Sequence, residues 1–404
     1  MIEARKPPIR QTGPVAWARR NLFGGIADTI VTLVGGALLV WALYSLLTWV
    51  FTGAHWEQVW NNLKLFAVYR FPTHLLWRPF TMVALVMFLL GIGAAGDKYE
   101  SLIVRGVFRW FMYAAGALAV VGLVFWPSVR FGWLAVALAG MAGLGLGTVV
   151  PSVRRLLPWL WGASVVVAFL LLYGVFEDGP LVRVSTRLWG GFLLTLVLSV
   201  VGIVVSFPLG ILLALGRRSD LPVIKVACTA FIEVVRGAPL ITWLFIASLL
   251  VPLLLGLSDP DSISALARSM VAVTLFSAAY MAENVRGGLQ AVPRGQVEAA
   301  RALGLSGWQT TLLIVLPQAL RAVIPAIVGQ AIGLFKDTSL VFIVGLFDFF
   351  NVADVVANQP ASLLVPGGIR LELSLFLAVV YWFFAYRMSA ASRQLETQLG
   401  VGVR

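Results

Sequence analysis

Residues 190–215 read GGFLLTLVLSVVGIVVSFPLGILLAL, and this stretch decides the class of fold. It contains no ionisable residue and is longer than the roughly 20 residues that a helix needs to cross a bilayer. Its apolar residues are continuous, whereas a strand of a membrane β-barrel alternates apolar and polar residues. We therefore predict a transmembrane helix here.

The same pattern recurs along the chain. Of its 404 residues, 60% are hydrophobic and only 12% are charged, which is more apolar than the composition of a soluble globular protein. We therefore predict an all-α integral membrane protein. About ten apolar windows are long enough to span a bilayer: 28–51, 79–96, 108–126, 132–150, 156–176, 190–215, 225–256, 266–286, 312–335 and 370–388.

The basic residues predict how these helices are oriented, because short cytoplasmic loops are enriched in Lys and Arg. Residues 1–27 are basic and precede an apolar run that is too long for a signal peptide, so we expect a retained cytoplasmic tail. Basic residues also follow the even-numbered windows: Lys98, Arg105, Arg109, Arg154, Arg155, Arg217, Arg218, Arg286, Arg294, Arg301, Arg387 and Arg393. Both termini are thus predicted to be cytoplasmic.

Several other functions are disfavoured by composition. The net charge of +12 is dispersed at membrane edges, which favours contact with anionic lipid over nucleic-acid binding. Cys228 is the only cysteine, and His55 and His74 lack the spacing of metal ligands, so we expect neither a disulfide nor a metal site.

The charged outer segment near residue 185 divides the chain. The windows in 28–185 are almost purely apolar, and we interpret this part as a transmembrane extension. The windows in 186–395 carry polar and ionisable residues at membrane depth, where such residues mark a pathway or an interface. We therefore place the function here, ahead of a cytoplasmic tail at 396–404.

A polar stretch separates two of the later windows: Glu298-Ala299-Ala300-Arg301-Ala302-Leu303-Gly304. We predict a short cytoplasmic helix at about 296–306, which Gly304 ends by adopting a positive φ. Ala299 and Ala300 would form a small, smooth face that a partner protein could approach. The alternative is an ordinary loop between helices.

This stretch and its surroundings resemble the permease subunits of bacterial ABC importers. The order Glu298, Ala299, Ala300, Gly304, Ile314, Leu316 and Pro317 is similar to the EAA loop of that family. Further stretches resemble its polar amino-acid uptake branch, namely residues 231–240 (FIEVVRGAPL), 279–288 (AYMAENVRGG), 316–321 (LPQALR) and 336–340 (KDTSL). The resemblance covers roughly 186–400. In its length and its N-terminal extension, the chain resembles the larger permease subunit of broad-specificity L-amino-acid importers from Gram-negative bacteria.

The resemblance implies a transport subunit of the bacterial inner membrane rather than an enzyme. Two permeases would enclose a path, two cytoplasmic ATPases would drive it, and a periplasmic binding protein would deliver the amino acid. Residues 298–304, with Leu316 and Pro317, would couple the chain to an ATPase. The chain has no Gly-x-x-x-x-Gly-Lys-Ser/Thr loop, so ATP and Mg would be bound by the partner ATPase and no cofactor by this chain. The long extension favours a heterodimer with a shorter permease.

Polar residues at membrane depth are the candidates for the substrate path: Thr195, Ser199, Ser277, Tyr280, Glu283, Gln330, Lys336, Asp337 and Thr338. Ser277, Tyr280 and Glu283 follow at intervals of three, so they can share one helix face. Together these residues offer partners for both the ammonium and the carboxylate of an amino acid. Glu283 has an equally good alternative, a structural salt bridge with Arg286 or Arg236.

Arg236, Gly237 and Pro239 interrupt the long window at 225–256, because proline lacks an N–H and disturbs the preceding turn. This interruption is either a hinge for alternating access or a packing kink. Two other classes of function remain as alternatives. An ion-gradient-driven secondary transporter would show matching interrupted segments in two halves, and a membrane-embedded enzyme would need a catalytic cluster in its spans. The sequence shows neither feature.

Overall fold

The computed structural model describes residues 13–96, 102–125, 130–256 and 262–400. Within these ranges the secondary structure is helical, and the only β-type pairings are two isolated bridges, Phe176 with Val182 and Gly191 with Asp348. The fold is therefore the all-α bundle that the apolar windows predict.

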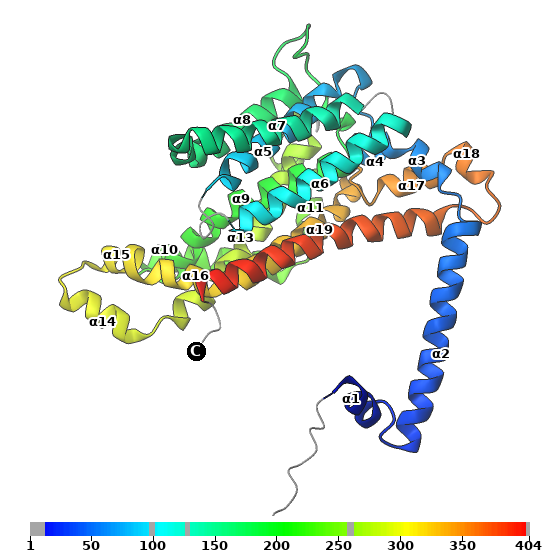
Figure 1. Ribbon diagram of the computed structural model, residues 1–404. Coiled ribbons are helices and arrows are strands. Elements are labelled where there is room, and N and C mark those ends of the chain that lie inside the picture. The colour runs from blue at the N-terminus through cyan, green and yellow to red at the C-terminus, as the bar shows by residue number, and fades with distance from the viewer. Residues whose placement is uncertain (1–12, 97–101, 126–129, 257–261, 401–404) are drawn as a thin grey trace, which may run out of the picture.

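The first part of the chain forms helices α1 to α8. Their bounds are α1 Pro14–Asn21, α2 Ile26–Thr48, η1 Trp49–Gly53, α3 Glu57–Asn61, α4 Leu63–Val68, η2 Thr73–Leu75, α5 Trp77–Ala94, α6 Leu102–Phe125, α7 Arg130–Val149, η3 Pro151–Leu156 and α8 Leu157–Tyr173. Helices α5, α6, α7 and α8 lie together, whereas α2 projects away from the rest (Figure 1). No residue of α2 is buried within the described part of the chain.

The second part forms the remaining helices. Their bounds are η4 Thr186–Leu188, α9 Gly191–Arg217, α10 Pro222–Gly237, α11 Leu240–Phe245, η5 Ile246–Leu250, α12 Val251–Leu254, α13 Ala265–Ala291, α14 Arg294–Ala302, α15 Gly307–Gln309, η7 Thr310–Val315, α16 Leu316–Asp337, η8 Thr338–Val344, α17 Val352–Ala357, α18 Pro360–Leu363 and α19 Arg370–Leu399. Helix α13 packs against both α9 and α16 and forms the centre of this part.

The helices agree with the predicted windows. Among the described residues, eight helices are long and apolar enough to span a membrane, or nine if a bent pair counts as one span. The remaining window, 108–126, falls on α6 within the described residues; α6 has 24 residues but is not among these candidate spans. The last helix is longer than its window, because α19 continues through the polar residues after 388 to Leu399.

The predicted interruption at Gly237 is confirmed as a break in the helix. Helix α10 ends at Gly237 and α11 begins at Leu240, and the two helices are bent by 105°. Pro239 lies at the N-cap of α11, where its missing N–H leaves no helical hydrogen bond unmade. The sequence thus builds two short helices at different angles from one apolar window.

The two parts of the chain share their apolar interior. Val68, Phe71 and Leu75 of the first part belong to the same buried cluster as Leu194 and Leu198 of α9. A second cluster joins Phe66 and Tyr69 to a group of aromatic residues from the later part, Phe347, Phe349 and Phe376. The segment between α2 and α5 is therefore packed onto the second part.

Helices α5 and α7 approach closely because their contact surface contains glycine. A Cβ atom added at Gly143 would lie 2.0 Å from the carbonyl oxygen of Phe88, which belongs to the backbone and cannot rotate away. Close packing through small residues is a common way for membrane helices to associate. The contact between α5 and α7 therefore depends on Gly143.

We expect the substitution Gly143→Val to destabilise the bundle by about 1–3 kcal/mol, the usual cost of overpacking a tight contact. Gly145→Val is a matched control in the same helix, because a Cβ atom at Gly145 meets nothing within 4 Å. The measurement is the thermal unfolding of both variants in detergent. Equal unfolding temperatures for the two variants would contradict the packing argument.

Candidate functional site

The predicted cytoplasmic helix is α14, and its bounds differ from the expected 296–306. The helix begins at Arg294, directly after Pro293 at the N-cap, and ends at Ala302. A second short helix, α15, follows, and the side chain of Ser306 caps it in a capping box with Gln309. The segment therefore folds as two short helices joined at 303–306. It projects at one end of the molecule (Figure 1).

Gly304 ends α14 in the way that the sequence predicts. Its φ is +79°, in the left-handed region that glycine adopts without strain. The N–H of Leu305 donates to the carbonyl of Ala300, and the N–H of Gly304 donates to that of Arg301, at 3.2 and 2.9 Å. This pair of hydrogen bonds is a Schellman motif, which fixes the direction in which the chain leaves the helix.

The predicted smooth face of α14 is only partly correct. Glu298, Ala299 and Gly304 are exposed, but Ala300 is buried, because it lies on the side of α14 that packs against η7. Two large apolar side chains that the sequence reading missed are exposed on this segment instead: Leu303 at 82% and Trp308 at 65%. A large aromatic residue in a polar loop is a feature that could have drawn attention to them.

The segment joins α16 through a π-helix. Residues 310–315 form η7, and Pro317 follows within the first turn of α16, next to Leu316. Proline cannot donate to the carbonyl one turn earlier, and a wider turn accommodates the ring and the unpaired carbonyl. The polar segment is thus connected directly to a membrane helix.

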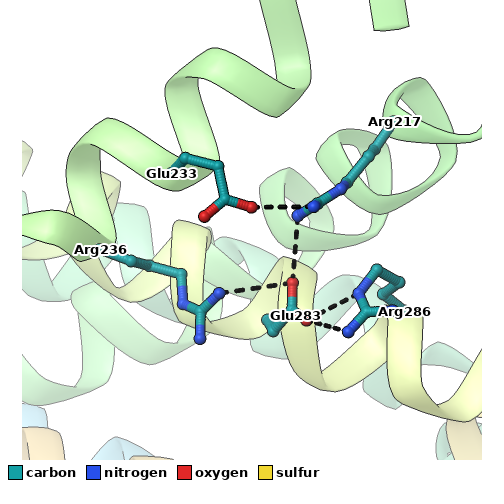
Figure 2. Close-up of polar contacts among 5 residues, drawn as sticks. All are labelled: Arg217, Glu233, Arg236, Glu283 and Arg286. Atoms are coloured by element: carbon teal, nitrogen blue, oxygen red, sulfur yellow. Dashed lines mark hydrogen bonds and ion pairs between the residues drawn. The ribbon is translucent and has the colours of Figure 1, made fainter.

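Five charged residues from three helices meet near the C-terminal ends of α9, α10 and α13 (Figure 2). Glu283 of α13 lies at the centre. It pairs with Arg217 at 3.3 Å, with Arg236 at 3.5 Å and, through a second oxygen, with Arg286 of its own helix. Arg217 also pairs with Glu233 at 2.8 Å. We call these five residues the ionic cluster.

The ionic cluster lies at the break in the window 225–256. Arg236 is the residue before Gly237, and its guanidinium also lies over the ring of Tyr280, 5.4 Å from the ring centroid. The cluster therefore ties the end of α10 to α13. Glu283 is already shared by three arginines in this conformation, so the predicted salt bridges with Arg286 and Arg236 are both present.

Two polar residues of the predicted path, Ser277 and Gln330, belong to a hydrogen-bonded group between α13 and α16. Gln330 donates to the carbonyl and the hydroxyl of Ser277, at 2.7 and 2.9 Å, and accepts from the amide of Asn284 at 2.7 Å. Ser277 in turn donates to Ser206 of α9 at 3.1 Å. Ser277 is buried whereas Tyr280 is exposed, so these two residues do not share one accessible face.

Three other path candidates surround a buried carboxylate, that of Asp348. Thr195 and Thr338 each donate a hydrogen bond to it at 3.4 Å, and Ser199 donates to the carbonyl of Thr195. Tyr381 and Asn351 complete the group, with Tyr381 donating at 3.3 Å and Asn351 donating through its backbone and its side chain. The carboxylate is fully buried.

Asp348 is not among the site residues predicted from the sequence. An aspartate within an apolar run is a feature that could have identified it, because such groups need dedicated partners at membrane depth. By contrast, Lys336 and Asp337 at the end of α16 are exposed, and the opposite charge that acts on Asp337 is that of Lys336 itself. They are the charged path candidates that lie outside both hydrogen-bonded groups and the ionic cluster.

The chain is similar to known proteins over its whole length. The inner membrane amino-acid ABC transporter permease protein YhdY of Escherichia coli K12 is 36% identical, over 96% of this chain and 94% of its own length. The glutamate/glutamine/aspartate/asparagine transport system permease protein BztC of Rhodobacter capsulatus is 37% identical, over 99% and 96%. Among solved structures, an amino acid ABC transporter crystallised with histidines matches at 27% identity and a TM-score of 0.46, over 52% of this chain and 92% of its own.

The family model for the binding-protein-dependent transport system inner membrane component matches residues 206–399. This range contains the ionic cluster, α14 and the π-helix before α16. The full-length relatives extend the similarity to the helices before residue 185. The chain belongs to the family of binding-protein-dependent transport system inner membrane components, in the long form of the amino-acid ABC transporter permeases.

Proposed function

We propose that this chain is the permease subunit of an ATP-driven importer that moves amino acids from the periplasm to the cytoplasm by alternating access. The observation that carries the proposal is the exposed segment of α14 and α15, which stands between two membrane helices and ends α14 in a Schellman motif. Its exposed Leu303 and Trp308 give it the apolar side chains with which protein interfaces are made.

In this proposal the segment fits a groove on a cytoplasmic ATPase, which binds ATP and Mg. Glu298, Ala299 and Gly304 face the ATPase, while Ala300 holds α14 against η7. Closure of the ATPases then moves α14, and the direct connection through η7 passes this movement to α16. ATP hydrolysis biases the bundle between its inward-facing and outward-facing states.

The complete importer contains more chains. A second permease, a shorter relative of this one, forms the other wall of the path, and a periplasmic binding protein delivers the substrate. Lys336 and Asp337 are the residues that we place on the path, because exposed charges at membrane depth need water, substrate or a partner. Both termini of this chain lie in the cytoplasm.

The substitution Glu283→Gln tests whether Glu283 belongs to the path or to the ionic cluster. Because Glu283 is shared by three arginines, we expect uptake of neutral and cationic amino acids to fall by the same factor. The bundle should lose about 1 kcal/mol of stability, because the cluster is partly exposed. Competition between lysine and glutamine for uptake measures the selectivity.

Glu233→Gln is the matched control, since Glu233 is more exposed and, among the described residues, forms an ion pair with Arg217 alone. It should lower uptake less than Glu283→Gln does. A selective loss of cationic substrates in Glu283→Gln would place Glu283 on the path and contradict its role in the ionic cluster.

The set of proteins that remain bound to this chain tests the proposed assembly. We expect gently solubilised membranes to yield the chain together with an ATPase and a second permease. Recovery of the chain as a monomer or homodimer that transports without an ATPase would contradict the proposal.

A further inference from the structure

An open apolar groove lies between α16 and the end of α19. Its volume is about 420 Å³, within the range of small-molecule sites. It is lined by Pro317 and Ile324 of α16, Leu395 of α19 and Phe207 of α9; Pro317 is exposed and the other three side chains are half-buried. The one charged residue in its lining is Arg321.

The depth of Arg321 in the membrane follows from its distance along α16. Gln330 is hydrogen-bonded to Ser277, which lies twelve residues after the start of α13 and fourteen before its end, so both mark the middle of the bundle. Arg321 precedes Gln330 by nine residues, or about 13 Å along the helix. The hydrocarbon core extends about 15 Å from its centre. Arg321 therefore lies where the acyl chains meet the headgroups, on the α14 side.

Arg321 has no acidic or hydrogen-bonding partner among the residues that the structure describes, and its side chain is exposed. The groove continues from Arg321 toward the middle of the bundle along Ile327 and Val328. A guanidinium at this depth is satisfied by a phosphate, which it binds with two N–H donors. The apolar groove that runs from Arg321 toward the middle of the bundle can accommodate an acyl chain.

We propose that this groove binds an anionic phospholipid of the inner leaflet, with its phosphate on Arg321 and one acyl chain along α16. The assignment to the inner leaflet rests on the proposed orientation, in which α14 is cytoplasmic. The occupant is a lipid rather than a second permease because a protein face would need a carboxylate at this depth to pair with Arg321, whereas the inner leaflet supplies anionic headgroups everywhere. The lipid bridges the helix that follows α14 to the last helix of the bundle.

The experiment measures lipid binding to the purified full-length chain with its co-purifying subunits. After delipidation, the complex is titrated with phosphatidylglycerol or with phosphatidylcholine of the same acyl chains, and bound lipid is counted by native mass spectrometry. We expect phosphatidylglycerol to bind more tightly than phosphatidylcholine. Arg321→Gln should weaken phosphatidylglycerol binding about fivefold, the usual effect of one basic residue near an anionic headgroup.

Two further variants separate the groove from general charge effects. Arg155→Gln removes the charge of another exposed arginine, in η3 and away from the groove, and should leave binding unchanged. Ile324→Trp fills the groove and should reduce phosphatidylglycerol binding while Arg321 is still present. Equal binding of the two lipids, or an equal loss in Arg155→Gln, would overturn the proposal.

The same variants identify the competing occupant. If a second permease covers the groove, Ile324→Trp will break the association of the permeases, and the intact complex will bind no lipid there. That outcome also overturns the proposal. Lipid binding is read without ATP or substrate, so a failure here is distinguishable from a failure of the proposed transport function.

Discussion

Replacing Gly304 with valine is expected to separate ATP hydrolysis from amino-acid uptake in the assembled transporter. At a φ of +79°, a β-branched residue is strained by about 1–3 kcal/mol. We expect residues 303–305 to relieve this strain by breaking the two hydrogen bonds of the Schellman motif. The chain would then leave α14 in another direction, and Leu303 would be displaced. Since a Cβ atom at Gly304 meets nothing within 4 Å, the membrane helices should fold unchanged.

Gly307→Val is the matched control for this substitution. Gly307 lies three residues further on in the same exposed segment, has open space around it, and does not adopt a positive φ. We expect this variant to keep uptake and ATPase activity in their normal ratio, whereas Gly304→Val lowers uptake at least tenfold while ATP hydrolysis continues. Equal uptake by the two variants would contradict the proposed role of α14 in coupling ATP hydrolysis to uptake.

Replacing Asp348 with alanine is expected to cause the largest loss of stability of any substitution considered for this chain. The carboxylate accepts hydrogen bonds from Thr195, Thr338, Asn351 and Tyr381, all within the interior of the bundle. Removing it leaves the Tyr381 hydroxyl and the Asn351 backbone N–H without their acceptor, and each such group costs about 1–3 kcal/mol. Thr195, Thr338 and the Asn351 side chain still reach backbone carbonyls. We expect a loss of about 3 kcal/mol or more, because the donors lie in one connected network.

Asp354→Ala is the control for Asp348→Ala, because Asp354 lies six residues later and its side chain forms, within the described part of the chain, one exposed pair with Arg370. Exposed pairs contribute about 0–1 kcal/mol, so this variant should unfold at nearly the normal temperature. Asp348→Asn keeps one acceptor oxygen and should fall between the two. Thermal unfolding in detergent measures all three variants, and similar unfolding temperatures for Asp348→Ala and Asp354→Ala would contradict the role of the network.

The features that follow from local chemistry could be predicted from the sequence. Continuous apolar runs specify membrane helices, Pro239 specifies a break in a window, and Gly304 specifies a left-handed helix end. Each depends on neighbouring residues only. The structure places all three where the sequence predicts them.

The features that depend on distant partners could not be predicted. Thr195 and Thr338 are far apart in sequence, and only the fold brings both to Asp348. Glu283 had two equally good interpretations, and the sequence already offered Arg286 and Arg236 as partners; only the fold adds Arg217 of α9 as a third arginine beside it. A polar residue at membrane depth indicates that a partner is needed there, but the residue type alone does not indicate whether that partner is a substrate or another part of the protein.

The burial of Ala300 illustrates the same limit at short range. Ala299 and Ala300 are adjacent and chemically identical, and the sequence alone treats them as one small face. Adjacent residues on a helix point in directions about 100° apart, so packing of α14 against η7 buries one and leaves the other exposed. The exposed apolar surface of this segment comes instead from Leu303 and Trp308.

The central claim, that uptake is driven by ATP, is tested most directly by measuring which energy source uptake requires. The chain is reconstituted in sealed vesicles with the proposed ATPase, second permease and binding protein, and a labelled amino acid is added on the side of the binding protein. The account predicts that uptake requires ATP on the side that α14 faces and continues after ionophores collapse all ion gradients. Uptake that proceeds without ATP and stops with the ion gradient would contradict it.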